Sequence, residues 1–179
     1  MGGPNIFVSV GEPTTDEQEQ FVRAIEARLK SEGMEPCTVG RNFFDADSPL
    51  KTVVNLMDGC SGAVIIALER TFFPAGISRR GGTREASLSN VKFATPWNQI
   101  EAGMAYSRGL PLLVIVENGI KSEGLLEPGY DWYVQSVKPE LSALTTVQFN
   151  GVLAGWKKKS KRFNQDSSRG QKSRLQIKP

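Results

Sequence analysis

Glu101 is the residue whose type and setting best suit chemistry. Trp97 precedes it by four positions and Asn98 by three, so on a helix the ring, the amide and the carboxylate lie along one side. The surrounding residues 100–105 are otherwise apolar, which indicates a carboxylate that is either partly buried or turned toward a cleft. Spacing alone leaves a solvent-facing glutamate on an ordinary helix equally open, although charged residues are rarely buried without a purpose.

The chain contains no histidine. Catalysis by Ser-His-Asp or Cys-His groups and metal sites with histidine ligands are therefore excluded, and acid or base chemistry must come from carboxylates, Tyr, Lys or Cys. Cys37 and Cys60 form neither a disulfide framework nor a zinc-binding spacing. Asp45 and Asp47 could bind a cation, but a loop that caps a helix is the favoured interpretation. We expect no metal site and no cofactor.

The length of 179 residues suits one domain with a proper core. Hydrophobic residues make up 39% and charged residues 23%, as in ordinary soluble proteins. The longest apolar runs, residues 62–68 and 110–116, are too short to cross a bilayer, and the N-terminus lacks the pattern of a signal peptide. We expect a cytoplasmic protein that is kept reduced and does not bind membranes.

Charge is distributed unevenly along the chain. Residues 157–179 carry nine Lys/Arg and one Asp, whereas the preceding residues carry 13 Lys/Arg and 18 Asp/Glu. This composition predicts a disordered or extended segment, so we divide the chain into a domain at 1–155 and a basic, flexible tail at 156–179. A solubilising tail is favoured over a contact with nucleic acid or an anionic membrane, because the body has no matching basic face. We therefore do not expect nucleic acid as a partner.

The order of elements predicts the fold class. Buried strands are predicted at residues 5–10, 62–68 and 110–116, a weaker strand at 36–39 and a last strand at 145–149. Helices are predicted after Thr14, after Ser48-Pro49 and from Thr95-Pro96 to Arg108. This alternation predicts an α/β protein of three layers with a central, mostly parallel five-stranded sheet.

In such folds ligands lie outside the carboxyl ends of the strands. Residues 9–13, residues 41–47, the segment from residue 69 onward, residues 117–119 and the start of the helix at residue 95 all fall at that edge. The hydroxyl and backbone N–H groups after the first strand could contact a ribose or a phosphate. The predicted ligand-binding residues are Ser9, Gly11, Glu12, Glu69, Arg70, Trp97 and Asn98.

Residues 62–68, the helix at 95–106 and the turn Gly109-Leu110-Pro111 together resemble the nucleoside 2-deoxyribosyltransferase-like superfamily. That family has a Glu-x-Gly-x-Ala segment, here Glu101 to Ala105, followed by a Gly-x-Pro entry into the next strand. The same stretch is similar to TIR-type NAD-cleaving domains, in which a glutamate follows a tryptophan on a comparable helix. Both resemblances imply a flavodoxin-like architecture and N-glycosidic chemistry.

The resemblance covers roughly residues 5–116 and implies a role for Glu101. Its carboxylate would lie beneath C1′ of a nucleotide or nucleoside and act as nucleophile or cation stabiliser during bond cleavage or base exchange. The family carries acidic residues after the third strand, whereas this chain has Glu69-Arg70 and then Arg79, Arg80 and Arg84. These arginines favour a phosphorylated ligand, such as a nucleoside monophosphate or an NAD-like dinucleotide. A solvated, flexible loop at 69–94 is the alternative.

Three functions follow from these features. The favoured one is an enzyme that acts on an N-glycosidic bond. The second is a catalytically silent nucleotide-sensing module, which the Arg-rich loop and the substituted acidic positions favour. The third is a TIR-like scaffold for protein assembly. We also expect the chain to form a homo-oligomer.

Overall fold

The computed structural model describes residues 3–175, with side chains described for residues 3–167. Its centre is a sheet of five parallel strands in the order β2-β1-β3-β6-β7. The strands are β1 (Asn5–Val10), β2 (Glu35–Cys37), β3 (Ala63–Ala67), β6 (Leu112–Glu117) and β7 (Tyr133–Val137). The predicted class, an α/β fold with a five-stranded parallel sheet, is confirmed.

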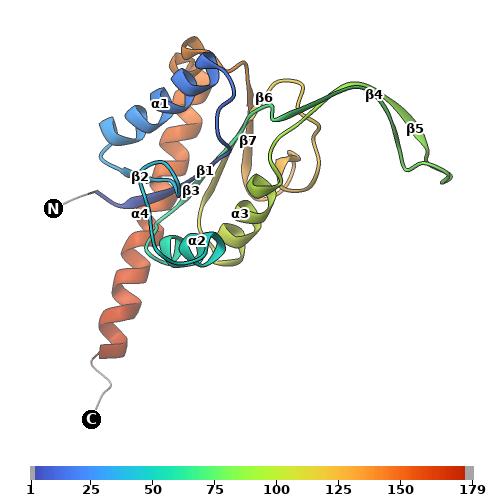
Figure 1. Cartoon of the computed structure of the whole chain (residues 1–179). Coiled ribbons are helices and arrows are strands. Elements are labelled where there is room, and N and C mark those ends of the chain that lie inside the picture. The colour runs from blue at the N-terminus through green and yellow to red at the C-terminus, as the bar shows by residue number, and fades with distance from the viewer. Residues whose placement is uncertain (1–2, 176–179) are drawn as a thin grey trace.

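Helices cover both faces of the sheet (Figure 1). One face is covered by α1 (Asp16–Ser31) and α4 (Val147–Leu175), the other by α2 (Pro49–Asp58) and α3 (Pro96–Ser107). Two short 3₁₀ helices, η1 (Gly124–Leu126) and η2 (Leu141–Thr145), lie in the connections beside β7. The result is the expected three-layer arrangement.

The core divides into two clusters because successive side chains of a strand point to opposite faces. Ile6 and Val8 of β1 pack with α1 and α4, whereas Phe7 between them packs with α2 and α3. Every residue of β3 is buried, as expected of a central parallel strand that is covered on both faces. The buried strands therefore support the loops that follow their carboxyl ends.

The helix starts follow from local hydrogen bonds. The N-cap of α3 is Thr95, whose hydroxyl accepts from the backbone N–H of Trp97, and Pro96 occupies the first helical position as predicted. For α1 the sequence offers Thr14 and Glu17 as a capping box, and this prediction is wrong by one position. Thr15 caps the helix by accepting from the N–H of Gln18, while Thr14 donates to the Gln18 side chain.

The predicted last strand at residues 145–149 is wrong. Residues 145–149 cover the end of η2 and the start of α4. The fifth strand is β7, in a segment whose sequence shows no regular pattern of apolar residues. The edge strand β7 pairs with β6 on one side only and mixes polar with apolar residues, such as Gln135 and Ser136 with Val137. Such a strand lacks the continuous apolar run of β3 and β6.

The segment 69–94, predicted to be an irregular loop, forms a β-hairpin. Its strands, β4 (Thr71–Ser78) and β5 (Ala86–Phe93), pair antiparallel with each other and project away from the body of the molecule (Figure 1). Most of their residues are exposed. We call residues 71–93 the arm.

The described part of the predicted tail is helical, so the expectation of a disordered or extended segment from residue 156 is wrong there. The helix α4 runs continuously through that boundary. Trp156 and Ser160 are buried, and Trp156 donates from Nε1 to the carbonyl of Pro111 over 2.9 Å. A Cβ on Gly62 would lie 3.0 Å from the Trp156 ring, so helix and sheet pack closely here. Residues 176–179 lie outside the described residues.

None of the helices in the described part of the chain combines the length and hydropathy needed to span a bilayer.

Candidate functional site

The candidate site lies where β1 and β3 end and α3 begins. A cavity of about 280 Å³ opens at this edge of the sheet. It is lined by Val10, Gly11, Glu12, Val39, Pro49, Val53, Arg70, Thr95, Trp97 and Glu101. We call it the Glu101 pocket. Five of the eight predicted site residues, Gly11, Glu12, Arg70, Trp97 and Glu101, line this one pocket although they come from three separate segments.

Glu101 is a half-buried carboxyl group. Burial raises its pKa to about 7, and a hydrogen bond with the Ser9 side chain acts in the opposite direction. No charged side chain among the described residues contributes to this shift in pKa. Burial thus places the pKa of Glu101 near neutrality, a shift that is typical of functional carboxyl groups.

Ser9 and Asn98 are both buried and do not line the Glu101 pocket. The Asn98 side-chain amide donates to the Ser9 hydroxyl over 2.9 Å and lies 3.4 Å from the carbonyl oxygens of Ser9 and Ile66. The Ser9 hydroxyl is in turn the polar group that acts to lower the pKa of Glu101. These two predicted ligand-binding residues thus form a polar chain that holds the Glu101 carboxyl group from the protein side.

A second, very small cavity of about 10 Å³ adjoins this chain. Asn98, Gln18, Glu69 and Arg70 are among the residues that line it. The Oδ1 atom of Asn98 is buried and has no hydrogen-bond partner among the described residues. A space of this size holds about one water molecule, which would satisfy that acceptor.

Arg70 is the cation at the wall of the Glu101 pocket. Its Nη1 donates to the carbonyl of Glu12 over 3.3 Å, and no carboxylate within residues 3–167 forms an ion pair with it. The guanidinium is exposed and keeps donors available for a ligand. Arg79, Arg80 and Arg84, which suggested a phosphate in the sequence, lie at the tip of the arm and do not line the pocket.

Glu69 does not face the Glu101 pocket. Its carboxylate pairs with Lys92 over 2.7 Å, and its backbone N–H donates to Oε2 of Glu117 over 2.8 Å. Lys92 also pairs with Glu117, which is 8% exposed, over 3.1 Å. Gln18 adds a bond from Nε2 to the carbonyl of Glu69. This cluster fixes the base of the arm beside the site. The sequence pattern placed Glu69 and Glu117 at this edge of the sheet but gave no signal for Lys92 and Gln18.

A larger cavity of about 900 Å³ continues the cleft toward α1. It shares Val10, Gly11, Glu12 and Val39 with the Glu101 pocket. Glu12 and Asp16 are exposed on its rim. Gly11 lines both cavities, and a Cβ there would come within 3.1 Å of the Thr95 side chain, so a larger residue would crowd that side chain.

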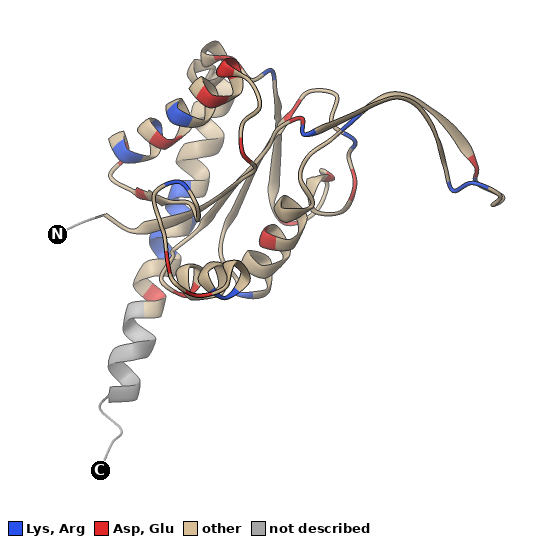
Figure 2. Ribbon diagram, viewed as in Figure 1, with Lys and Arg blue, Asp and Glu red and all other residues tan. Residues whose placement is uncertain are grey.

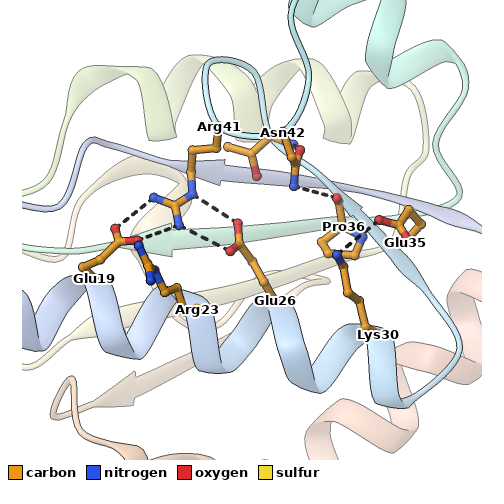
Figure 3. A network of polar contacts seen from close by, with 9 residues as sticks. Glu19, Arg23, Glu26, Lys30, Glu35, Pro36, Arg41 and Asn42 are labelled. Atoms are coloured by element: carbon orange, nitrogen blue, oxygen red, sulfur yellow. Dashed lines mark hydrogen bonds and ion pairs between the residues drawn. The ribbon is translucent and has the colours of Figure 1, made fainter.

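Arg41 is also among the residues that line this larger cavity. Figure 3 shows its contacts with α1. It pairs with Glu19 over 3.0 Å and with Glu26 over 3.2 Å, both on α1. Hydrogen bonds from Arg41 and Arg23 hold the pKa of Glu19 at about 2. Because two carboxylates already engage the guanidinium, Arg41 serves to fix the loop after β2 onto α1 and is not a free anion-binding group.

Trp97 lies at the entrance of the Glu101 pocket with 45% of its surface exposed. Leu50 on α2 and Ile100 on α3 are similarly exposed. Among the described residues, no group of three or more His, Cys, Asp or Glu side chains is arranged to hold a metal ion. Asp45 instead accepts a hydrogen bond from the backbone N–H of Asp47, as in a turn before α2.

No protein-family model and no curated protein sequence matches this chain. Among solved structures, it is similar to a CMP N-glycosidase, BcmB, from Clostridium botulinum, with 16% identity and a TM-score of 0.41 over 75% of this chain and 87% of that chain. It is also similar to the metal-soaked flavodiiron core of Flv1 from Synechocystis sp. PCC6803, with 12% identity and a TM-score of 0.51.

The second likeness covers 92% of this chain but 37% of the flavodiiron chain, so this protein spans little more than a third of that length. Together with the strand order, it shows a flavodoxin-like fold. The predicted flavodoxin-like fold is thereby confirmed.

Proposed function

We propose that this protein cleaves or exchanges the N-glycosidic bond of a nucleotide or nucleoside, with Glu101 as nucleophile or cation stabiliser. The observation that carries the proposal is the setting of Glu101. A half-buried carboxyl group with a pKa of about 7 lines a cavity of about 280 Å³, beside an exposed tryptophan. That volume is close to the lower end of the range for small-molecule sites.

The proposed mechanism depends on the charge that develops as the N-glycosidic bond breaks. When the bond between C1′ and the base nitrogen breaks, its electron pair leaves with the base, and positive charge builds up on the sugar. A carboxylate in a pocket of low polarity stabilises that charge more strongly than water does. If Glu101 also attacks, one of its oxygens forms a bond to C1′ while the bond from C1′ to the base breaks. The departing base takes up a proton from water. Water or a second base then displaces the carboxylate and restores the enzyme.

The positive charge that builds up on the sugar also explains why the raised pKa of Glu101 is compatible with its proposed role as nucleophile or cation stabiliser. The carboxylate is the active form, and about half of it is present near pH 7 in the free protein. Positive charge on the sugar favours ionisation, so the interaction becomes stronger as the bond breaks. Such differential stabilisation of the transition state is what accelerates a reaction.

Two neighbours suit the rest of a nucleotide. The exposed ring of Trp97 offers a surface on which a base or sugar can stack. Arg70, which has no carboxylate partner in the described chain, offers paired N–H donors to a phosphate. The adjoining cavity of about 900 Å³ leaves room for a larger ligand such as an NAD-like dinucleotide.

A chromatographic screen tests this function. Purified wild-type protein and the Glu101→Gln and Glu12→Gln variants are incubated with nucleoside monophosphates, deoxynucleosides and NAD, and free base is quantified. We expect the wild type to release base from at least one of these, Glu101→Gln to lose about 1,000-fold or more, and Glu12→Gln to lose less than about tenfold. Glu12→Gln removes a carboxylate from the same pocket and is the matched control.

Equal base release by the wild type and by Glu101→Gln would indicate a contaminating enzyme or another catalytic group and would refute the proposal. Tight binding of a nucleotide by the wild type with no release of base would instead identify the silent nucleotide-sensing module. Calorimetric titration with the same ligands separates these two outcomes.

A further inference from the structure

The side-chain amide of Asn98 is engaged on one side only. Its Nδ2 donates to the Ser9 hydroxyl over 2.9 Å and lies 3.4 Å from the carbonyl oxygens of Ser9 and Ile66. Three acceptors around Nδ2 fix which corner of the amide is the nitrogen. Oδ1, on the other corner, is buried and has no hydrogen-bond partner within residues 3–167, and the residue as a whole is 1% exposed. Because almost all buried polar groups are paired, Oδ1 is an acceptor for a donor that the described chain does not supply.

Asn98 lines the small cavity of about 10 Å³ that adjoins the Glu101 pocket. This volume is enough for one water-sized group and no more. Both spaces are lined by Gly11, Glu12, Arg70 and Thr95. A ligand in the Glu101 pocket therefore lies beside the small cavity and can place one oxygen atom in it.

The free oxygen of Asn98 selects the chemistry of the group that enters. A carbonyl oxygen accepts from an O–H or N–H group, whereas a phosphate is mainly an acceptor near neutral pH. The helix α3 has one charged residue, Glu101, one turn after Asn98, and its ribbon is otherwise uncharged (Figure 2). The donors of a nucleotide are the hydroxyl groups of its sugar and the N–H groups of its base, so Oδ1 suits one of these.

The choice between these donors rests on the proposed function, which places C1′ of the sugar at the Glu101 carboxylate. In a displacement at C1′ the carboxylate approaches the face of the sugar ring opposite the base. In a natural ribonucleotide the 2′-hydroxyl projects from that same face, on the carbon next to C1′, and the base projects from the other face. The sugar hydroxyl is therefore the donor on the side of Glu101.

The spacing of Asn98 and Glu101 fits a hydroxyl on the neighbouring carbon. The two residues are three positions apart on α3, and Cβ atoms at that spacing are about 5–6 Å apart. Both side chains also approach the same residue, Ser9. A sugar with C1′ at Glu101 thus brings its 2′-hydroxyl within reach of Asn98.

We propose that the small cavity beside Asn98 binds the 2′-hydroxyl group of a ribonucleotide, which donates a hydrogen bond to Oδ1 of Asn98. The hydroxyl takes the place that one water molecule can fill in the free protein and reproduces its hydrogen bond. A 2′-deoxy sugar presents a C–H group at this point and offers the acceptor no donor. The protein is thereby selective for ribonucleotides over 2′-deoxyribonucleotides.

Calorimetric titration of the full-length Glu101→Gln variant tests the proposal, since binding is then measured without turnover. The probes are the ribonucleoside monophosphates of the four bases and their 2′-deoxy, 3′-deoxy and 2′-O-methyl forms. For each base that binds, the 2′-deoxy form should bind at least about tenfold more weakly than the ribonucleotide, and the 3′-deoxy form within about threefold of it. The 2′-O-methyl form should bind at least about 100-fold more weakly, because a cavity of about 10 Å³ has no room for the added methyl group.

Two further variants, each combined with Glu101→Gln, test whether Asn98 is the acceptor. With Asn98→Ala the ribonucleotide and the 2′-deoxy form should bind within about twofold of each other, since Oδ1 is gone. Gln135→Ala is the matched control and should keep the preference. Gln135 is also buried, and its Oε1 has no partner among the described residues, but it lies on β7 and lines neither cavity. Should Asn98→Ala not fold, the 2′-deoxy and 2′-O-methyl forms still decide the question with Asn98 in place.

The outcomes separate this site from the proposed function. Equal binding of the ribonucleotide and the 2′-deoxy form would overturn the hydroxyl site, even if the wild type releases base, and so would a preference that persists in Asn98→Ala. A preference for ribonucleotides in a protein that releases no base would support the site and refute the proposed cleavage. Failure of every nucleotide to bind would overturn both.

Discussion

At the scale of single residues, Glu101 is distinguished by what surrounds it. It shares a hydrogen bond with Ser9, and no charged side chain of the described chain contributes to the shift in its pKa. Burial therefore outweighs the hydrogen bond, and the pKa rises to about 7. In an ordinary solvent-facing glutamate neither effect would be present.

The first prediction concerns the pH dependence of activity. If the ionised Glu101 is the active form, kcat/KM of the free enzyme should rise with pH and level off above about 7. Ser9→Ala removes the hydrogen bond that lowers the pKa of Glu101, so the rising limb should move to higher pH. A pH–rate profile of both proteins measures this shift. A uniform loss of rate at every pH, with no displacement of the limb, would show that Ser9 has only a structural role.

The second prediction concerns stability. The pKa of Glu101 is higher in the folded state than its ordinary value of 4.5, so the folded protein binds more protons between pH 4.5 and about 7. The cost of a charged Glu101 is therefore absent below pH 4.5 and complete above about 7. Glu101→Gln imitates the neutral form and should be about 1–2 kcal/mol more stable than the wild type at pH 8, the partial exposure of the side chain limiting the gain.

Urea unfolding of both proteins at pH 5 and pH 8 measures this difference. The stabilisation of Glu101→Gln should be larger at pH 8 than at pH 5. A variant that is equally or less stable than the wild type at pH 8 would mean that Glu101 carries its charge without a penalty.

At the scale of elements, the sequence allowed the central strands to be predicted and failed where burial is incomplete. The continuous apolar runs at β3 and β6 are typical of buried parallel strands. The strand β7 lies at an edge, and the arm contacts the rest of the described chain at its base, so neither has a pattern imposed by a core. Strands of this kind depend on neighbours that are distant in sequence or on another molecule.

The helix α4 was missed for a different reason. Its many lysines suggested disorder, yet Phe149, Leu153, Trp156, Ser160 and Phe163 recur every three or four residues. The first four of these are buried, and Phe163 packs against the core. That stripe was present in the sequence but was outweighed by composition.

The third prediction tests whether this helix belongs to the domain. Trp156 is 4% exposed, packs in the core cluster of α1 and α4 and bonds to the carbonyl of Pro111. Trp156→Ala should lower the free energy of unfolding by about 3–5 kcal/mol, as expected when a large buried ring is removed. Lys158→Ala, one helical position beyond Lys157 on an exposed side, should change it by less than about 0.5 kcal/mol. Similar stabilities of the two variants would place α4 outside the folded unit.

The candidate site, too, could be predicted from the sequence only in part. The rule that ligands lie at the carboxyl ends of parallel strands placed Gly11, Arg70 and Glu101 together correctly. It could not show that Glu69 turns to Lys92, because that pair depends on how the arm returns to the body. Nor could it show that Asn98 supports Ser9, since a side-chain orientation is set by packing rather than by spacing.

At the scale of the whole molecule, the structure joins a rigid parallel sheet to a cleft at one edge and to an arm beside that cleft. The cleft combines the Glu101 pocket, which Arg70 lines, with a larger cavity lined by Glu12, Asp16, Glu19 and Arg41. The arm begins directly after Arg70 and is held by Lys92.

The central claim is that the Glu101 carboxylate acts on the sugar carbon, and chemical rescue tests it most directly. Base release is measured with wild type and with Glu101→Ala, in the absence and presence of formate, on a substrate identified by the screen. The account predicts that Glu101→Ala is slower by about 1,000-fold or more and that formate, a small carboxylate able to enter the vacated space, restores part of the rate. A Glu101→Ala variant that releases base within about threefold of the wild-type rate, with or without formate, would contradict it.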